Sequence, residues 1–239
     1  MLKINIKKYL SMKKIIIIGA GAMGSAFAVP CLENQNDVTL VGTHLEDELI
    51  KDIKSNNNLH PALNIELPSK LKVEKFEKLK AILDEGVDII VAGVSSIGIE
   101  WFVHQIVNNY KKNLPIILLT KGLAIEDNEL ITLSDKIKKL LKKQGHTDVN
   151  ISAIKGPCLA AGLAYKMRTG TVIANPDIKE TEKLKKIIST DYYSTEVSND
   201  LTGIELSGAI KNIYSMLIGA SEGLSNSKAP KEIQSKYYL

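Results

Sequence analysis

Two lysines stand in sequence contexts that could support proton transfer or anion binding. Lys121 directly follows the apolar run 115–119, and Lys211 lies in the mostly apolar stretch 201–222. Gly208, about one helical turn before Lys211, leaves room beside that side chain. Burial of such a lysine would lower its pKa and make it a usable general acid or base. The alternative for each is an ordinary surface lysine whose charged end remains in water.

A glycine-rich turn follows the first strongly apolar run of the chain, residues 15–18. Gly19, Gly21 and Gly24 form the pattern G-x-G-x-x-G. In such a turn the first glycine permits a tight bend, the second lets the backbone approach a pyrophosphate, and the third lets the next helix pack closely. Free N–H groups at the helix start then face the anion. The pattern alone could be structural, but a strand before it and a helix after it predict dinucleotide binding.

The residues after the second expected strand, 38–41, leave the form of the cofactor open. An acid at the end of this strand would bind the ribose hydroxyls of NAD. The chain continues instead with Thr43 and His44, and Glu46 and Asp47 come slightly later. His44 could contact the 2′-phosphate of NADP, or it could be a surface histidine. Both NAD and NADP are therefore compatible with this segment.

Apolar runs of strand type alternate with longer amphipathic stretches, which predicts an α/β fold with a mostly parallel sheet. Strands are expected at 15–18, 38–41, 88–92, 115–119, 151–154, 171–174 and 192–196, and helices at 22–34, 76–83, 99–109, 128–143 and 184–188. After Asp200 the pattern changes to one helix, 201–222, apolar nearly all round and therefore expected to be buried. The predicted organisation is a leader of uncertain relevance, 1–12, a dinucleotide-binding domain, 13–198, and an incomplete helical substrate domain, 199–239.

The composition is that of a soluble globular protein. Of the 239 residues, 44% are hydrophobic and 24% charged, with a formal net charge of +4. The cations are lysines apart from Arg168, whereas proteins that bind nucleic acids favour arginine. Cys31 and Cys158 lack metal-type spacing. A membrane span would need about twenty consecutive apolar residues. We expect a cytoplasmic protein without a nucleic-acid partner, a metal or a membrane span.

Five segments in this order resemble the NAD(P)-dependent glycerol-3-phosphate dehydrogenase family, over residues 13–229. They are the glycine turn, Pro61 with Leu67-Pro68, Thr120-Lys121-Gly122-Leu123, Gly156-Pro157-Cys158-Leu159-Ala160 and, most specific, the stretch 199–212 that ends in Lys211-Asn212. The resemblance implies a Rossmann-type domain followed by the start of an all-helical C-terminal domain. It also implies interconversion of glycerol 3-phosphate and dihydroxyacetone phosphate, for glycerophospholipid precursor synthesis, by a homodimer.

The resemblance implies a role for each matching residue. Lys211 would protonate the substrate carbonyl as hydride arrives and deprotonate the alcohol in the reverse direction. The substrate would contact Lys121, Gly156, Lys211 and Asn212. The cofactor, NAD or NADP, would contact Gly19, Gly21, Ala22, Met23, Gly24, His44, Ser95, Lys121 and Ala160.

Departures from the family pattern keep alternatives open. Ser95 stands where the family usually has proline, Thr43 where it commonly has arginine, and Cys158-Leu159 replaces Ser-Phe. These differences affect cofactor preference more than reaction type. The arginine with which the family's later helical domain binds phosphate has no match, so we expect poor activity of the 239-residue form. Two other readings are a β-hydroxyacid dehydrogenase of the same superfamily and an inactive dinucleotide-binding module.

Overall fold

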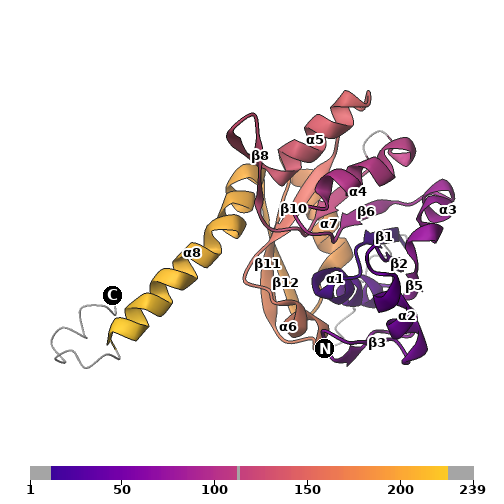
Figure 1. The fold of residues 1–239 in the computed structure, drawn as a ribbon, viewed down its shortest axis with the longest axis horizontal. Coiled ribbons are helices and arrows are strands. Elements are labelled where there is room, and N and C mark those ends of the chain that lie inside the picture. The colour runs from indigo at the N-terminus through magenta and orange to yellow at the C-terminus, as the bar shows by residue number, and fades with distance from the viewer. Residues whose placement is uncertain (1–11, 112–113, 226–239) are drawn as a thin grey trace, which may run out of the picture.

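An eight-stranded sheet forms the centre of the computed structural model, which describes residues 12–111 and 114–225 (Figure 1). Its strands are β1 (Lys14–Ile18), β2 (Asp37–Val41), β5 (Lys72–Glu74), β6 (Ile89–Ala92), β7 (Ile116–Leu118), β10 (Ile151–Lys155), β11 (Thr169–Ala174) and β12 (Tyr193–Ser198). The order is β12-β11-β10-β7-β6-β1-β2-β5, and neighbours are parallel except β10 and β11. The predicted α/β class is confirmed. The strand order along the sheet reverses between the parallel strands β1 and β6, and sheets of this kind bind ligands at such a point.

Helices cover both faces of the sheet. One layer contains α1 (Ala22–Glu33), α2 (Asp47–Ser55), α6 (Ala160–Ala164) and α7 (Ile178–Ile188). The other contains α3 (Leu79–Asp84), α4 (Ile99–Ile106) and α5 (Leu133–Lys143), with short 3₁₀ segments η1 (Phe76–Lys78) and η2 (Val107–Asn109). Ile15 and Ile17 of β1 face the first layer, and Ile16 and Ile18 face the second. A continuous β-branched run suits a strand that is buried on both sides.

Two small hairpins lie outside the central sheet, and the sequence analysis did not predict them. They are β3 (Leu59–His60) with β4 (Ile65–Glu66), and β8 (Leu123–Glu126) with β9 (Glu129–Thr132). The helix predicted for 128–143 is therefore wrong at its start. Asp127 and Asn128 both adopt positive φ, as the two-residue turn of a tight hairpin requires. α5 begins only after Thr132, whose hydroxyl accepts a hydrogen bond from the Asp135 N–H at 3.2 Å.

The long helix α8 (Leu201–Ser225) extends away from the sheet as an arm (Figure 1). Asp200 caps its start, because its carboxylate accepts a hydrogen bond from the Gly203 N–H at 2.8 Å. The base of α8 packs on β10, β11 and the β8–β9 hairpin and buries Leu201 and Glu205. Burial of the whole helix was expected and is wrong for the described residues. An apolar stripe beyond the base is 36% to 57% exposed: Leu206, Ile210, Ile213, Leu217 and Leu224.

None of the helices in the described ranges is long and apolar enough to span a membrane. The expected leader lies outside the described residues up to residue 11, as does the end of the expected helical domain from residue 226 onward.

The exposed stripe of α8 predicts self-association of the 239-residue chain. Its members are spaced by three, four or seven residues, the repeat of helices that pack lengthwise. We expect the double variant Ile213→Lys with Leu217→Lys to shift the chain toward monomer, because a lysine is costly to bury in a helix–helix contact. Sedimentation velocity measures the shift. Ser215→Lys, on the other side of α8, is the matched control, and identical sedimentation of the two variants would contradict the prediction.

Candidate active site

The glycine turn joins β1 to α1 at the point where the strand order reverses. Gly19 has a φ of +110°, and a Cβ there would lie 2.7 Å from the carbonyl group of Gly93. A Cβ on Gly24 would lie 2.1 Å from the Gly19 oxygen. At Gly21 the nearest atom to such a Cβ is Glu46 Oε1, at 3.8 Å, so this side of the turn is open. No side chain caps the start of α1. Its first N–H groups are thus available to a phosphate, as at other helix starts.

The contact between Gly24 and Gly19 predicts a large cost for any side chain. We expect Gly24→Ala to lower the free energy of unfolding by roughly 2–4 kcal/mol, because α1 would have to move away from β1. Urea denaturation measures the change. Gly162→Ala in α6 is the control, since nothing lies within 4 Å of a Cβ there and φ is not positive. Similar unfolding free energies for the two variants would show that α1 can shift without penalty.

Ala20, between the first two glycines, is held by side chains from three other places in the chain. Its N–H donates to Glu46 Oε2 at 2.9 Å. Its carbonyl oxygen accepts a hydrogen bond from Ser25 Oγ at 2.9 Å and lies 3.0 Å from His60 Nε2. His60 is fully buried, and its Nδ1 accepts from the Leu63 N–H at 3.3 Å, so Nε2 carries the hydrogen. These bonds fix the turn in one conformation, and the sequence analysis had assigned none of these side chains a part in it.

The two lysines that the sequence singled out lie near one another at the carboxyl edge of the sheet. Lys121 follows β7, and Lys211 is a partly buried residue of α8. Burial lowers the pKa of Lys121, and the positive charge of Lys211 lowers it further. The charge of Lys121 in turn lowers the pKa of a third lysine, Lys155 at the end of β10, which was not predicted as a site residue. Lys121, Lys155 and Lys211 are called the lysine cluster below.

Lys155 is the buried member of the lysine cluster, with 4% of its surface exposed. Its Nζ donates to the carbonyl oxygens of Thr120 and Leu118, the latter at 3.3 Å. Burial lowers the pKa of Lys155 to about 8, the Glu205 carboxylate opposes this shift, and the charge of Lys121 adds to it. Lys155 thereby anchors the end of β7 from which Lys121 projects. A strand prediction that stopped at Ile154 left this lysine unnoticed.

The base of α8 packs directly against Lys155. A Cβ on Gly208 would lie 3.2 Å from Lys155 Cδ, so a small residue is needed there. Glu205, 1% exposed, accepts a hydrogen bond through Oε1 from the Ser134 N–H at 3.2 Å. Glu205 therefore joins α8 to α5 while its charge acts on Lys155. These contacts set the position of α8, and with it that of Lys211, relative to β10.

The lowered pKa of Lys155 predicts a pH dependence of stability. An unperturbed lysine titrates near 10.5, and Lys155 in the folded protein titrates near 8. Between these values the unfolded chain binds more protons, so the free energy of unfolding rises with pH. Relative to Lys155→Met, we expect wild type to gain about 1 kcal/mol per pH unit between about pH 8 and pH 10. Urea denaturation over that range checks it, with the exposed Lys142→Met as control. Parallel pH profiles for wild type and Lys155→Met would contradict it.

The other residues predicted for the substrate side occupy the same edge. Gly156 follows Lys155. A Cβ on Gly156 would lie 2.9 Å from Thr171 Cα, so its close packing against β11 is sufficient to require glycine, without any contact to a substrate. Asn212 is exposed beside Lys211. Ala160, which was predicted to contact the cofactor, begins α6. Burial raises the pKa of the Cys158 thiol, which disfavours the reactive thiolate.

The residues predicted for the cofactor side flank the glycine turn. Ser95 is exposed in the loop after β6, and the hydroxyl of Thr120 donates to the Val94 carbonyl at 2.7 Å in the same loop. His44 is exposed after β2, with its ring centroid 5.0 Å from that of Trp101 and 6.2 Å from that of Phe76. His44 is therefore part of an aromatic cluster rather than an isolated surface histidine.

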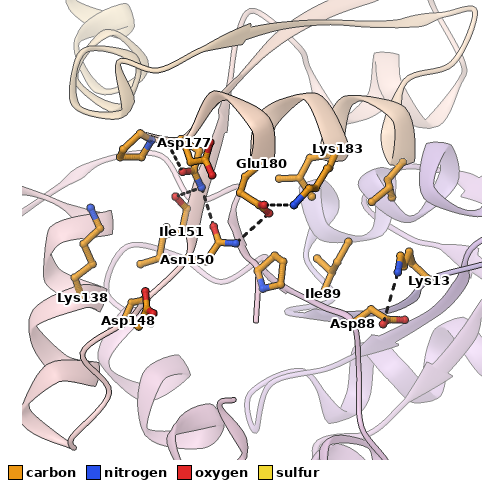
Figure 2. Close-up of a pocket in the computed structure, with 16 residues that line it drawn as sticks. Lys13, Asp88, Ile89, Lys138, Asp148, Asn150, Ile151, Asp177, Glu180 and Lys183 are labelled. Atoms are coloured by element: carbon orange, nitrogen blue, oxygen red, sulfur yellow. Dashed lines mark hydrogen bonds and ion pairs between the residues drawn. The ribbon is translucent and has the colours of Figure 1, made fainter. Parts of the chain in front are cut away.

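A pocket of about 900 Å³ lies at the opposite edge of the sheet, at the amino ends of β1, β6, β7 and β10 (Figure 2). Its amide side chains are already joined to neighbours. Asn150 donates to Glu180 at 3.2 Å, and Asn175 donates to Asn150 at 2.9 Å (Figure 2). Ligands of open α/β sheets bind at the carboxyl ends of the strands. We therefore place the candidate site at the glycine turn and the lysine cluster, not in this pocket.

A mostly parallel sheet whose strand order reverses, with an open glycine turn at its carboxyl edge, defines a dinucleotide-binding protein of Rossmann type. The comparison with known families goes further. The family described as NAD-dependent glycerol-3-phosphate dehydrogenase, N-terminus, matches residues 14–181. The chain belongs to this family.

Individual relatives agree with this assignment. The NADP(+)-dependent glycerol-3-phosphate dehydrogenase of Archaeoglobus fulgidus is 35% identical over 216 residues, covering 90% of this chain and 62% of the relative. A Mesoplasma florum glycerol-3-phosphate dehydrogenase named for NAD(P)+ is 31% identical, covering 85% and 59%. The crystal structure of the Coxiella burnetii glycerol-3-phosphate dehydrogenase shares the fold, with a TM-score of 0.77 and 23% identity, covering 95% and 65%. The chain thus spans less than two thirds of these relatives.

Proposed function

We propose that this chain binds NAD or NADP and interconverts dihydroxyacetone phosphate and glycerol 3-phosphate. The observation that carries the proposal is the approach of Lys121 and Lys211 to one another at the edge of the sheet that holds the open glycine turn. The open side of Gly21 and the uncapped start of α1 suit a pyrophosphate. A bound nicotinamide would supply or accept hydride. Two ammonium groups suit a substrate that carries a phosphate.

Lys211 is the proposed general acid. Its Nζ–H gives a proton to the carbonyl oxygen while the carbonyl carbon receives hydride, so that C=O becomes CH–OH. In the reverse direction the neutral amine accepts the hydroxyl proton. Lys121, Gly156 and Asn212 are proposed to contact the substrate. The proposed cofactor contacts are Gly19, Gly21, Ala22, Met23, Gly24, His44, Ser95, Lys121 and Ala160.

We also propose a cytoplasmic homodimer that supplies glycerol 3-phosphate to glycerophospholipid synthesis. The exposed heptad-spaced stripe of α8 supports self-association. The names of the relatives support the substrate. The domain division at residue 198 fits the start of α8 at Leu201.

Replacement of Lys211 tests the reaction. We expect Lys211→Met to lower kcat by roughly 10²–10⁴, the usual contribution of a positioned general acid, and to leave NADH affinity unchanged. Oxidation of NADH in the presence of dihydroxyacetone phosphate is followed by absorbance, and NADH binding by fluorescence. The exposed Lys186→Met is the matched control.

Each alternative gives a different result in these assays. NADH binding without turnover by wild type would favour an inactive dinucleotide-binding module. Turnover of a β-hydroxyacid but not of glycerol 3-phosphate would favour the other dehydrogenase class. Full activity of Lys211→Met would remove Lys211 from the mechanism.

A further inference from the structure

Glu46 brings a carboxylate to the glycine turn, although no acid stands at the end of β2. It immediately precedes α2, and Gly42 lets this helix start close to the strand end. A Cβ on Gly42 would lie 2.7 Å from a side-chain carbon of Ile50 and 3.4 Å from Glu46 Cβ. The loop between Gly42 and α2 therefore turns back and directs Glu46 toward Gly21.

The two carboxylate oxygens of Glu46 have different surroundings. Oε2 accepts hydrogen bonds from the Thr43 N–H at 2.7 Å and the Ala20 N–H at 2.9 Å. These two main-chain donors fix the carboxylate between the end of β2 and the glycine turn. Oε1 faces Gly21, 3.8 Å from the position of a Cβ. Among residues 12–111 and 114–225, no hydrogen-bond donor to Oε1 is present. An acceptor is thus held ready on the open side of the turn.

In dinucleotide-binding turns of this type, an acid about twenty residues beyond the glycines binds the ribose 2′-hydroxyl of NAD. Glu46 has this separation from the turn, and it reaches the turn from the start of α2 rather than from the strand. We propose that Glu46 binds the adenosine ribose and makes NAD the preferred cofactor. The proposal rests on the proposed function, because it requires a dinucleotide on this turn.

NADP carries a phosphate in place of the 2′-hydroxyl, and a carboxylate repels it. Neighbouring lysines on α2 are already paired with acids. Lys51 lies 2.5 Å from Glu48, and Lys54 lies 3.4 Å from Glu74. A 2′-phosphate would therefore meet an acceptor that cannot donate to it, while the hydroxyls of NAD can donate to Oε1.

Binding of the two reduced cofactors tests the proposal. NADH and NADPH are titrated separately into the full chain, with nicotinamide fluorescence as the readout. We expect wild type to bind NADH at least about tenfold more tightly. Glu46→Gln keeps the size and an acceptor oxygen but removes the charge, so NADH affinity should fall and NADPH affinity should rise. Glu182→Gln, the same substitution at an exposed glutamate of α7, is the matched control and should leave the ratio unchanged.

The outcomes separate this proposal from its rivals. Equal losses of NADH and NADPH affinity in Glu46→Gln would show that Glu46 only holds the turn, and would overturn the proposal. Wild type that binds NADPH as well as or better than NADH would overturn it too, whether or not the variant folds. Wild type that binds neither cofactor would defeat the proposed function itself.

Discussion

The approach of α1 to the end of β1 is the constraint on which the candidate site depends. The distances at Gly19 and Gly24 leave no space for a side chain on either residue. Gly93, at the end of β6, is drawn into the same contact, since its own Cβ would lie 3.0 Å from the Gly19 oxygen. Three backbone segments therefore meet at the point where the strand order reverses. Only this closeness presents the first N–H groups of α1 at the crevice edge rather than behind side chains.

The lysine cluster depends on a different constraint, because burial disfavours the charged form of Lys155 and Lys121. Lys155 is buried among carbonyl oxygens, and the Glu205 carboxylate partly offsets the cost of its charge. Glu205 belongs to α8 and bonds to the start of α5, so the same pair fixes the helix that carries Lys211. The hydrogen bonds of Lys155 to the end of β7 position Lys121 in turn. A buried residue can thus determine the geometry of two others that are proposed to contact the substrate.

Local patterns predicted the parts of the fold that local chemistry determines. The continuous isoleucine run of β1 and the three glycines specify a strand, a turn and a helix within a dozen residues. The hairpin at Asp127 and Asn128 was missed because helical periodicity in the lysine-rich segment beyond it was extended backward over a turn. The prediction that α8 is buried was wrong, because an apolar composition indicates that a helix needs a covering surface but does not show that the chain supplies one. Lys121 and Lys211 were singled out as candidate site residues from a strand end and from helix spacing, and their roles stay predictions.

Contacts between segments far apart in sequence could not be predicted in this way. Lys155 resembles any other lysine in a lysine-rich chain until β7 and Gly208 are seen to enclose it. His60 acquires its role only because the β3–β4 hairpin folds back onto Ala20. Glu46 was noted in the sequence but given no role, because its position lies beyond the end of the strand. In the structure, the absence of a side chain at Gly42 lets the loop bend so that Glu46 lies beside the glycine turn.

The residues proposed for cofactor choice and those proposed for the reaction are consequently located on separate elements. The proposed ribose end of the crevice is formed by β2, the turn and the start of α2, and the proposed proton-transfer end by β7, β10 and α8. Within residues 12–111 and 114–225, the carboxylate of Glu46 and the lysine cluster share no hydrogen bond or ion pair. With the role proposed for Glu46, substitutions around it would alter which dinucleotide binds without moving Lys211. Relatives are named for NADP or for both cofactors, and a separation of this kind would let the cofactor differ while the reaction stays the same.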